Sequence, residues 1–369
     1  ILFSVNGLAE KKQFTINNDL KKKIIEFCNL ILNNTSEIIP YKFKYTNNYS
    51  NSVFDFNFVD SIFIKNHLNY SSIYGIAFPP GTNPWISGSK KNIRSDGNVF
   101  INFDYFNKSD ITLTSYLHLI VLHELGHAFG LYHTHDNGGN TNIIAGINYY
   151  NKYSQGTLKQ NNFIYTVMTY NDKSSSYSKK NKSNGYVKNW MAYDIAALQY
   201  LYGKSKNNVT NDIYYINKNN WECINDSNGI NTISGQNSNK GITINLNNAN
   251  LDKDSQNAGG YITKLNNVDT AGLLISKNSV ITNAIGSTYN DIIYSNNRIN
   301  IIRADSGNDI IYATNGKIFC GKGNDKIIVK NIHFTKKLYI DGFSNKNLLI
   351  INLNYNDIKK IFVNSSGTI

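Results

Sequence analysis

Cysteine, arginine and long apolar runs are scarce in this chain of 369 residues, and each scarcity excludes a class of protein. Cys28, Cys223 and Cys320 lie far apart and form no Cys-x-x-Cys pair, which excludes a disulfide framework and a cysteine zinc ribbon. Two alternatives remain: a single disulfide between Cys223 and Cys320, or three free or buried thiols. No apolar run approaches the ~20 residues that a spanning helix needs, so the sequence predicts no membrane span.

The positive charge of the chain comes almost entirely from lysine. Lysine and arginine together number 37 against 25 acidic residues, a net charge of +12, yet the only arginines are Arg94, Arg298 and Arg303. The excess lysine accompanies many asparagines, isoleucines and tyrosines, all with A/T-rich codons, which favours a genomic base bias over a nucleic-acid footprint. The sequence therefore predicts no nucleic-acid partner, and a basic nucleic-acid-binding protein stays as the weaker alternative.

The apolar content and its spacing predict a packed protein of two domains. Hydrophobic residues make up 41% of the chain, which excludes wholesale disorder, and the length suits two domains. Apolar spacing predicts helices over 18–32, 113–130 and 191–202, strands over 41–45, 53–59, 73–78 and 99–103, and a surface loop over 171–184. From Lys204 onward only short Ile-rich runs between Asn and Gly turns remain, so the expected domains are residues 1–203 and 204–369.

A short repeat marks the second domain. An Asn-Asp pair followed by apolar residues recurs in the segments 289–294, 307–312 and 323–328. Nonapeptide repeats of this kind build a parallel β-roll whose glycine-rich turns bind Ca²⁺. The carboxylates of Asp291, Asp309 and Asp325 are therefore predicted calcium ligands, and the residue two places after each aspartate should point into the roll. Chance turns in an Asn-rich chain remain the alternative.

The segment 123–133 reads His-Glu-Leu-Gly-His-Ala-Phe-Gly-Leu-Tyr-His and predicts a catalytic zinc site. His123 and His127 share one helix face and can chelate one ion. Gly130 permits a sharp turn that brings back His133 as the third ligand, leaving an open position for water. Glu124 is placed to take the proton of that water as a general base.

Two other histidines near this motif have no ligand spacing. His118 is predicted to be a packed helix residue and His135 a loop residue. The structural alternative for the motif itself, ordinary histidines on a helix, is disfavoured by the length of the matching string.

The extended motif resembles that of the metzincin zinc endopeptidases. Residues 165–170 resemble the methionine turn of that family, with Met168 beneath the metal. Tyr170, two places later, is similar to a tyrosine of the serralysins and astacins that is a fifth, displaceable metal ligand. Segment 194–203 resembles the end of the serralysin catalytic domain, and 283–286 resembles the lead into its calcium repeats.

Two features depart from the serralysin pattern. Thr134 stands where serralysins usually have proline after the third histidine. The repeats have lost several turn glycines, since Tyr289, Ala304 and Cys320 replace them.

The resemblance implies a fold, an activity and partners. It implies an α+β metzincin-like catalytic domain followed by an all-β parallel β-roll with degenerate calcium repeats. The implied protein is a secreted endopeptidase with one catalytic zinc and structural calcium, whose protein or peptide substrates bind extended along an edge strand at 75–79. Tyr170 would donate a hydrogen bond to the oxyanion. The resemblance also implies that the protein is a monomer and that a proteinaceous protease inhibitor is a further partner. A calcium-dependent binding or adhesion module, with the first domain as a scaffold, is the remaining alternative.

Overall fold

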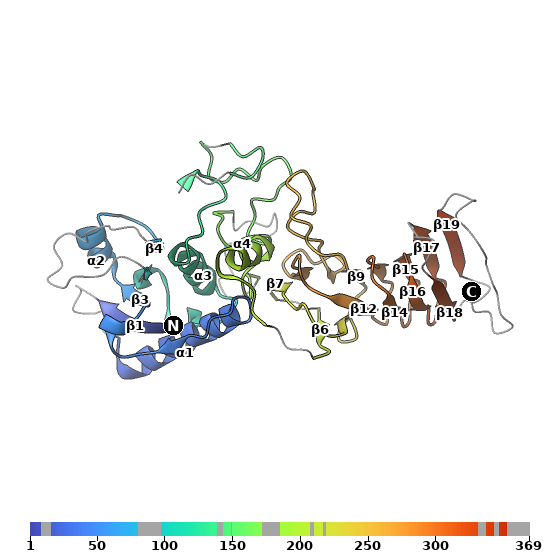
Figure 1. Ribbon diagram of the computed structural model, residues 1–369, viewed down its shortest axis with the longest axis horizontal. Coiled ribbons are helices and arrows are strands. Elements are labelled where there is room, and N and C mark those ends of the chain that lie inside the picture. The colour runs from blue at the N-terminus through green and yellow to red at the C-terminus, as the bar shows by residue number, and fades with distance from the viewer. Residues whose placement is uncertain are drawn as a thin grey trace. The chain divides into compact units, whose positions relative to one another are not determined.

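The computed structural model describes residues 1–8, 16–79, 97–138, 143–148, 150–171, 185–206, 210–216, 219–330, 337–342 and 347–352. The chain divides into two compact units, Ile1–Lys206 and Asn207–Ile369 (Figure 1). Of the predicted surface loop at 171–184, all but Asn171 falls outside the described residues.

Within the described residues, the first unit contains a five-stranded sheet in the order β2-β1-β3-β5-β4. Its strands are β1 (Leu2–Leu8), β2 (Lys44–Tyr45), β3 (Phe54–Val59), β4 (Gly75–Ala77) and β5 (Asn98–Asn102). All pairs are parallel except β4 with β5, which are antiparallel, so β4 forms an edge of the sheet. Every residue of β3 and β5 is buried, as expected for strands covered on both faces.

Two of the longer helices of the first unit pack against this sheet. The longer ones are α1 (Asn18–Ser36), α3 (Tyr116–Ala128) and α4 (Ala192–Tyr202); the short ones are η1 (Tyr49–Asn51), α2 (Ser61–Phe63), η2 (Ile64–Leu68), η3 (Phe103–Tyr105) and η4 (Lys108–Asp110). Helix α1 packs against β1 and β2, and α3 packs against β4 and β5 (Figure 1). The three predicted helices are confirmed. Helix α3 begins later than predicted because the Ser115 side chain caps it by accepting a hydrogen bond from the His118 N–H.

Among its described residues, the second unit contains two six-stranded sheets and the two-stranded sheet β11-β7, and its strands pair in parallel except β9 with β10. Its strands are β6 (Ile213–Tyr215), β7 (Trp221–Ile224), β8 (Asn231–Ser234), β9 (Ile242–Asn245), β10 (Lys264–Leu265), β11 (Gly272–Ile275), β12 (Ile281–Ile285), β13 (Ile292–Tyr294), β14 (Asn300–Arg303), β15 (Ile310–Ala313), β16 (Gly316–Phe319), β17 (Lys326–Lys330), β18 (Leu338–Asp341) and β19 (Leu348–Asn352). From β12 to β19 each strand joins the opposite sheet from the one before, and all of their pairings are parallel (Figure 1).

The core of the second unit lies between the two sheets. Ile293, Ile311 and Ile327, each two places after a repeat aspartate, are fully buried in it, so the predicted inward positions are confirmed. The predicted architecture, an α+β unit followed by a parallel β-roll, is confirmed as well.

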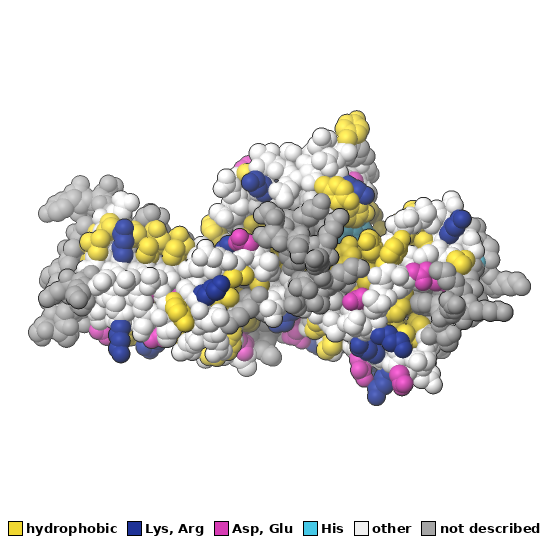
Figure 2. Space-filling model, turned by 180° about the vertical axis from the view of Figure 1, so that it is seen from behind, with side chains coloured by type: hydrophobic (Ala, Val, Ile, Leu, Met, Phe, Trp, Pro, Cys, Tyr) yellow, Lys and Arg dark blue, Asp and Glu magenta, His cyan; other side chains and the backbone are white. Residues whose placement is uncertain are grey.

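Three further predictions from composition concern disulfides, membrane spans and surface charge. Cys28, Cys223 and Cys320 are buried and form no disulfide with one another, so the alternative of a Cys223–Cys320 bridge is wrong. Among the described residues, no helix combines the length and apolarity that crossing a membrane requires. On the face drawn in Figure 2, lysines and arginines are interspersed with acidic side chains and form no single patch.

Candidate metal centre

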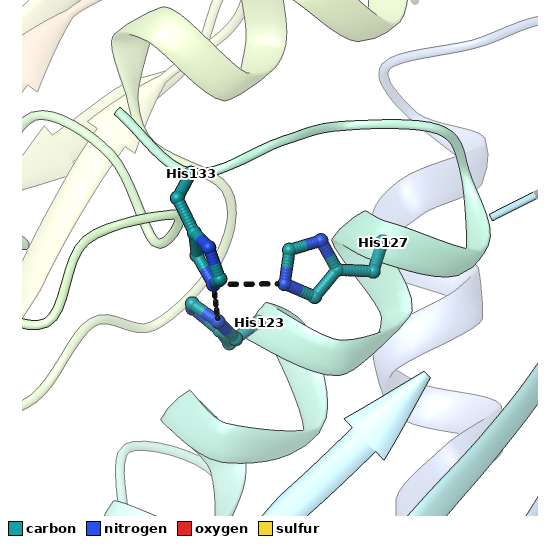
Figure 3. Close-up of side chains that lie close together, drawn as sticks. All are labelled: His123, His127 and His133. Atoms are coloured by element: carbon teal, nitrogen blue, oxygen red, sulfur yellow. Dashed lines mark hydrogen bonds between the residues drawn. The ribbon is translucent and has the colours of Figure 1, made fainter. Parts of the chain in front are cut away.

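A helix and the turn that ends it supply the three histidines of the motif. His123 and His127 project from α3 one turn apart. The helix ends at Ala128 and the chain turns at Gly130, whose φ of 84° favours glycine; the N–H groups of Gly130 and Leu131 donate to the carbonyls of His127 and Gly126 at 2.8 and 2.9 Å. This turn reverses the chain, so that His133 faces the other two rings (Figure 3).

The three imidazoles converge on one point through their Nε2 atoms. The His133 Nε2 lies 3.2 Å from that of His123 and 3.1 Å from that of His127 (Figure 3). Ligands at 2.0–2.1 Å from a tetrahedral zinc ion stand about 3.3 Å apart. The spacing of the nitrogens therefore fits a zinc ion bound by three histidines.

The protonation of the rings also fits a cation. Each Nδ1 faces an oxygen that can only accept: the Val167 carbonyl at 2.7 Å from His123, the Leu131 carbonyl at 2.8 Å from His127, and a carboxylate oxygen of Asp136 at 2.7 Å from His133. The ring proton therefore sits on each Nδ1, and three Nε2 lone pairs face one another. Burial lowers the pKa of His127 to about 4 and the pKa of His123 well below its usual value, so both rings are neutral. Converging lone pairs repel unless a cation lies between them.

The general-base candidate Glu124 lies buried between α3 and the edge strand β4. A Cβ atom on Gly75 would stand 2.7 Å from the Glu124 Cγ and 3.0 Å from its Oε1, so the strand approaches this closely only because residue 75 is glycine. Burial raises the pKa of Glu124 to about 8, and a hydrogen bond from the Ala77 backbone opposes this rise. A divalent cation at the three Nε2 atoms would lower this pKa.

The predicted methionine turn packs beneath the histidines. Met168 is buried, with its sulfur against α3 at Gly126, where a Cβ atom would collide with it. The buried carboxylate of Asp194, at the start of α4, accepts hydrogen bonds from the Thr166 hydroxyl at 2.7 Å and from the Val167 N–H at 2.8 Å. It thereby holds Val167, the residue whose carbonyl orients His123.

Tyr170 stands beside the histidines, as the resemblance predicts. Its ring centroid lies 5.6 Å from that of His123 and 4.7 Å from that of His133, and 37% of the residue is exposed. Burial raises the pKa of Tyr170 to about 12, so the phenol keeps its proton. A protonated phenol beside the centre can donate a hydrogen bond.

Two predictions about the other histidines have different outcomes. His118 is fully buried in α3 with its ring edge against Phe27, which confirms the predicted packing role. His135 lies in a loop as predicted, but it is buried between the rings of His133 and Tyr170, at centroid distances of 4.7 and 4.5 Å. His133, His135 and Asp136 form a second group of side chains with metal-ligand chemistry.

Asp291, Asp309 and Asp325 form a hydrogen-bonded ladder along one edge of the roll, which we call the aspartate edge. The Asp309 Oδ1 accepts from the Asp291 N–H at 2.8 Å, and the Asp325 Oδ1 accepts from the Asp309 N–H at 3.0 Å. Among the described residues, the Oδ2 atoms of Asp309 and Asp325 are buried without a hydrogen-bond partner. Asp291 differs, because both its oxygens accept hydrogen bonds from Ser287 and one accepts from the Ile242 N–H.

Comparison with known proteins points to one group of peptidases. No protein-family model matches the chain. The chain is 29% identical over 213 residues to serralysin of Proteus mirabilis, a match that covers 55% of this chain and 40% of that protein. It is 28% identical over 258 residues to metallopeptidase AprA of Pseudomonas marginalis, covering 64% of this chain and 48% of the relative. The matched region thus spans less than half the length of either relative. These similarities confirm the predicted resemblance: the chain is similar to serralysin-type metallopeptidases.

Proposed function

We propose that this chain is a secreted zinc-dependent endopeptidase that hydrolyses peptide bonds in extended protein substrates. One observation carries the proposal: His123, His127 and His133 direct their Nε2 atoms at one point, and the buried Glu124 directly follows His123 in α3. The similarity to serralysin and metallopeptidase AprA supports the same activity. The proposed catalytic domain is residues 1–203 and the proposed β-roll domain is 204–369. We further propose a monomer with a proteinaceous inhibitor as a second partner.

The chemistry divides between the metal and Glu124. Zinc, when bound by His123, His127 and His133, supplies a Lewis acid that polarises the scissile carbonyl and acidifies water. The Glu124 carboxylate takes a proton from the attacking water and passes it to the nitrogen of the leaving amine. Glu124 directly follows His123 in α3 and is buried, which would keep the proposed base away from bulk solvent.

The substrate would bind along the edge strand β4. The Phe78 N–H donates to the Asn98 carbonyl, and the Tyr74 carbonyl accepts from the Asn102 N–H, so the backbone groups of residues 74 and 78 point towards β5. In a strand the intervening Gly75 and Ala77 direct theirs to the opposite side. An extended peptide can pair with the outward groups of Gly75 and with the carbonyl of Ala77, whose N–H already donates to Glu124, and its backbone would then lie beside Glu124.

Tyr170 is the proposed oxyanion donor. Its protonated phenol stands beside His123 and His133, where negative charge develops on the carbonyl oxygen during attack. The resemblance also supports a role for Tyr170 as a displaceable metal ligand.

Calcium is the proposed partner of the aspartate edge. The unpartnered oxygens of Asp309 and Asp325 are hard donors of the kind that Ca²⁺ prefers, and Asp291 adds a carboxylate on the next turn. Calcium here would stabilise the roll and take no part in hydrolysis.

Hydrolysis of casein by the purified chain, with the zinc content of the same samples, tests the proposal. The wild-type chain should cleave casein, and Glu124→Ala should keep zinc while losing activity by several powers of ten, because the base is removed. Glu26→Ala, an exposed glutamate on α1, is the matched control and should keep full activity. Near-normal turnover by Glu124→Ala would place the chemistry elsewhere. A chain that binds calcium yet cleaves nothing would favour the adhesion module.

A further inference from the structure

The three histidines of the centre differ in the group that orients each ring. The Nδ1 atoms of His123 and His127 donate to neutral backbone carbonyls of Val167 and Leu131. The Nδ1 of His133 donates to a carboxylate, the Oδ2 of Asp136, at 2.7 Å. Only this third ring therefore has a charged partner behind it.

His133 is also the histidine with the least support from regular structure. His123 and His127 are fixed by the backbone of α3, whereas His133 lies beyond the turn at Gly130, outside any helix or strand. Its side chain is 18% exposed. A ring in such a segment needs a side-chain partner to hold its direction and its tautomer, and Asp136 lies three residues ahead in the same segment.

Asp136 is itself held in place. Its second oxygen, Oδ1, accepts from the Gly138 N–H at 3.0 Å, which closes a turn and aims Oδ2 at His133. The segment is anchored at its other end by Thr134, whose N–H donates to the Met168 carbonyl at 3.2 Å. A proline at position 134 has no N–H and could not make this bond. The carboxylate is therefore positioned by local structure, not by chance contact.

We propose that Asp136 is the positioning residue of the third histidine: it fixes the ring of His133 with Nε2 towards the metal and strengthens that nitrogen as a ligand. A carboxylate behind a ligating imidazole raises the basicity of the ligand, and loss of such a partner commonly weakens metal binding 10–100-fold. This inference rests on the proposed zinc site, but Asp136 itself does not contact the metal.

Zinc affinity, measured by competition with a chelating dye, tests the inference without recourse to activity. Asp136→Ala removes both the charge and the acceptor, and we expect its zinc to bind about 10–100-fold more weakly than in the wild type. Asp136→Asn keeps an oxygen for the Nδ1–H but removes the charge, and we expect an intermediate loss. Asp110→Asn is the matched control, because that carboxylate is also half-buried and accepts a backbone hydrogen bond, from Asn107 at 2.8 Å. It should bind zinc as the wild type does.

Two further measurements keep the result from being ambiguous. The metal-free Asp136 variants should unfold on heating as the metal-free wild type does, since the role concerns the metal and not the fold. The visible spectrum of the cobalt-substituted Asp136→Ala protein should differ from that of the wild type because one nitrogen ligand is misplaced. Zinc affinity of Asp136→Ala within twofold of the wild type would overturn the inference. Failure of the wild type itself to bind zinc would instead overturn the proposed function.

Discussion

The histidine centre of the first unit and the aspartate edge of the second are both proposed cation sites, but they are built in different ways. At the centre, the three imidazole rings are oriented one by one, each through its own Nδ1 partner. At the edge, the carboxylates of Asp309 and Asp325 each accept a hydrogen bond from the backbone N–H of the preceding repeat aspartate, and among the described residues their Oδ2 atoms are buried and unpartnered.

This difference separates a site for chemistry from a site for stability. Burying neutral imidazoles is inexpensive, so the centre can be formed before the metal binds and keep a position open for substrate. Burying like charges is unfavourable. Burial and then the neighbouring carboxylates Asp291, Asp325 and Asp305 raise the pKa of Asp309 to about 7. The roll should therefore depend on its cation for stability, whereas the centre should depend on its cation for activity.

Replacement of His133 should separate the two sites most sharply. His133→Ala removes one of three converging nitrogens, so we expect loss of stoichiometric zinc and of casein hydrolysis, while the stabilisation of the roll by calcium stays unchanged. Elemental analysis, a casein assay and thermal unfolding with and without calcium check this. Unchanged zinc content in the variant would show that another group completes the site.

Tyr170→Phe should lower kcat and leave the zinc content unchanged. If the phenol donates to the oxyanion, its loss acts on the transition state, and kcat should fall about 10²–10³-fold, or about 3–4 kcal/mol, with little change in KM. Zinc content should stay at the wild-type level because the three histidines remain. Steady-state kinetics on a peptide substrate decide the matter, and an unchanged kcat would assign Tyr170 a packing role only.

Gly75→Ala should disturb the general base alone. The added Cβ would meet Glu124 at 2.7 Å, so the carboxylate must shift, and a displacement of about 1 Å can reduce rates on the order of 100-fold. We expect a lower kcat with normal zinc content. Ile76→Val, in the same strand, is the control and should leave kcat near the wild-type value. Equal activity of the two variants would mean that β4 and Glu124 are not in contact during turnover.

Asp309→Asn should change the stability of the roll and leave hydrolysis intact. In the calcium-free protein the folded pKa of about 7 exceeds the ordinary value of 3.8. Between these values the unfolded chain has lost the proton that the folded chain keeps, so stability should fall as pH rises from about 4 to 7. The asparagine variant should show a smaller fall.

The same substitution should weaken the response to calcium. We expect the calcium-induced rise in Tm to shrink by on the order of 2–4 °C. Asp254→Asn, an exposed carboxylate in the same unit, should behave as the wild type in both tests. A full calcium response in Asp309→Asn would remove the aspartate edge from calcium binding.

Local spacing explains what the sequence could predict. The four-residue interval of His123 and His127, the glycine that ends the helix and the apolar period of α1 and α4 all act within a few residues, so their structural consequences follow from helix geometry. The repeat of Asp291, Asp309 and Asp325 likewise predicts one edge of a roll, since equivalent residues of successive turns stack.

Partners brought together by the fold explain what the sequence could not predict. Gly75 lies 49 residues before Glu124, which it contacts. Asp194 accepts a hydrogen bond from the Val167 N–H, 27 residues earlier. No local sequence pattern joins either pair. The strand β1 offers only a short apolar alternation, and its burial depends on pairing with β3. Asp136 is the exception, because a carboxylate three residues after a ligand histidine is a local signal that could have been recognised.

The central claim is that His123, His127 and His133 hold one zinc ion through their Nε2 atoms. Anomalous diffraction at the zinc edge from crystals of the purified protein tests it most directly. The account predicts a single strong peak in the first unit, about 2.0–2.1 Å from each of the three nitrogens. No peak there, or a peak confined to the group of His133, His135 and Asp136, would contradict it.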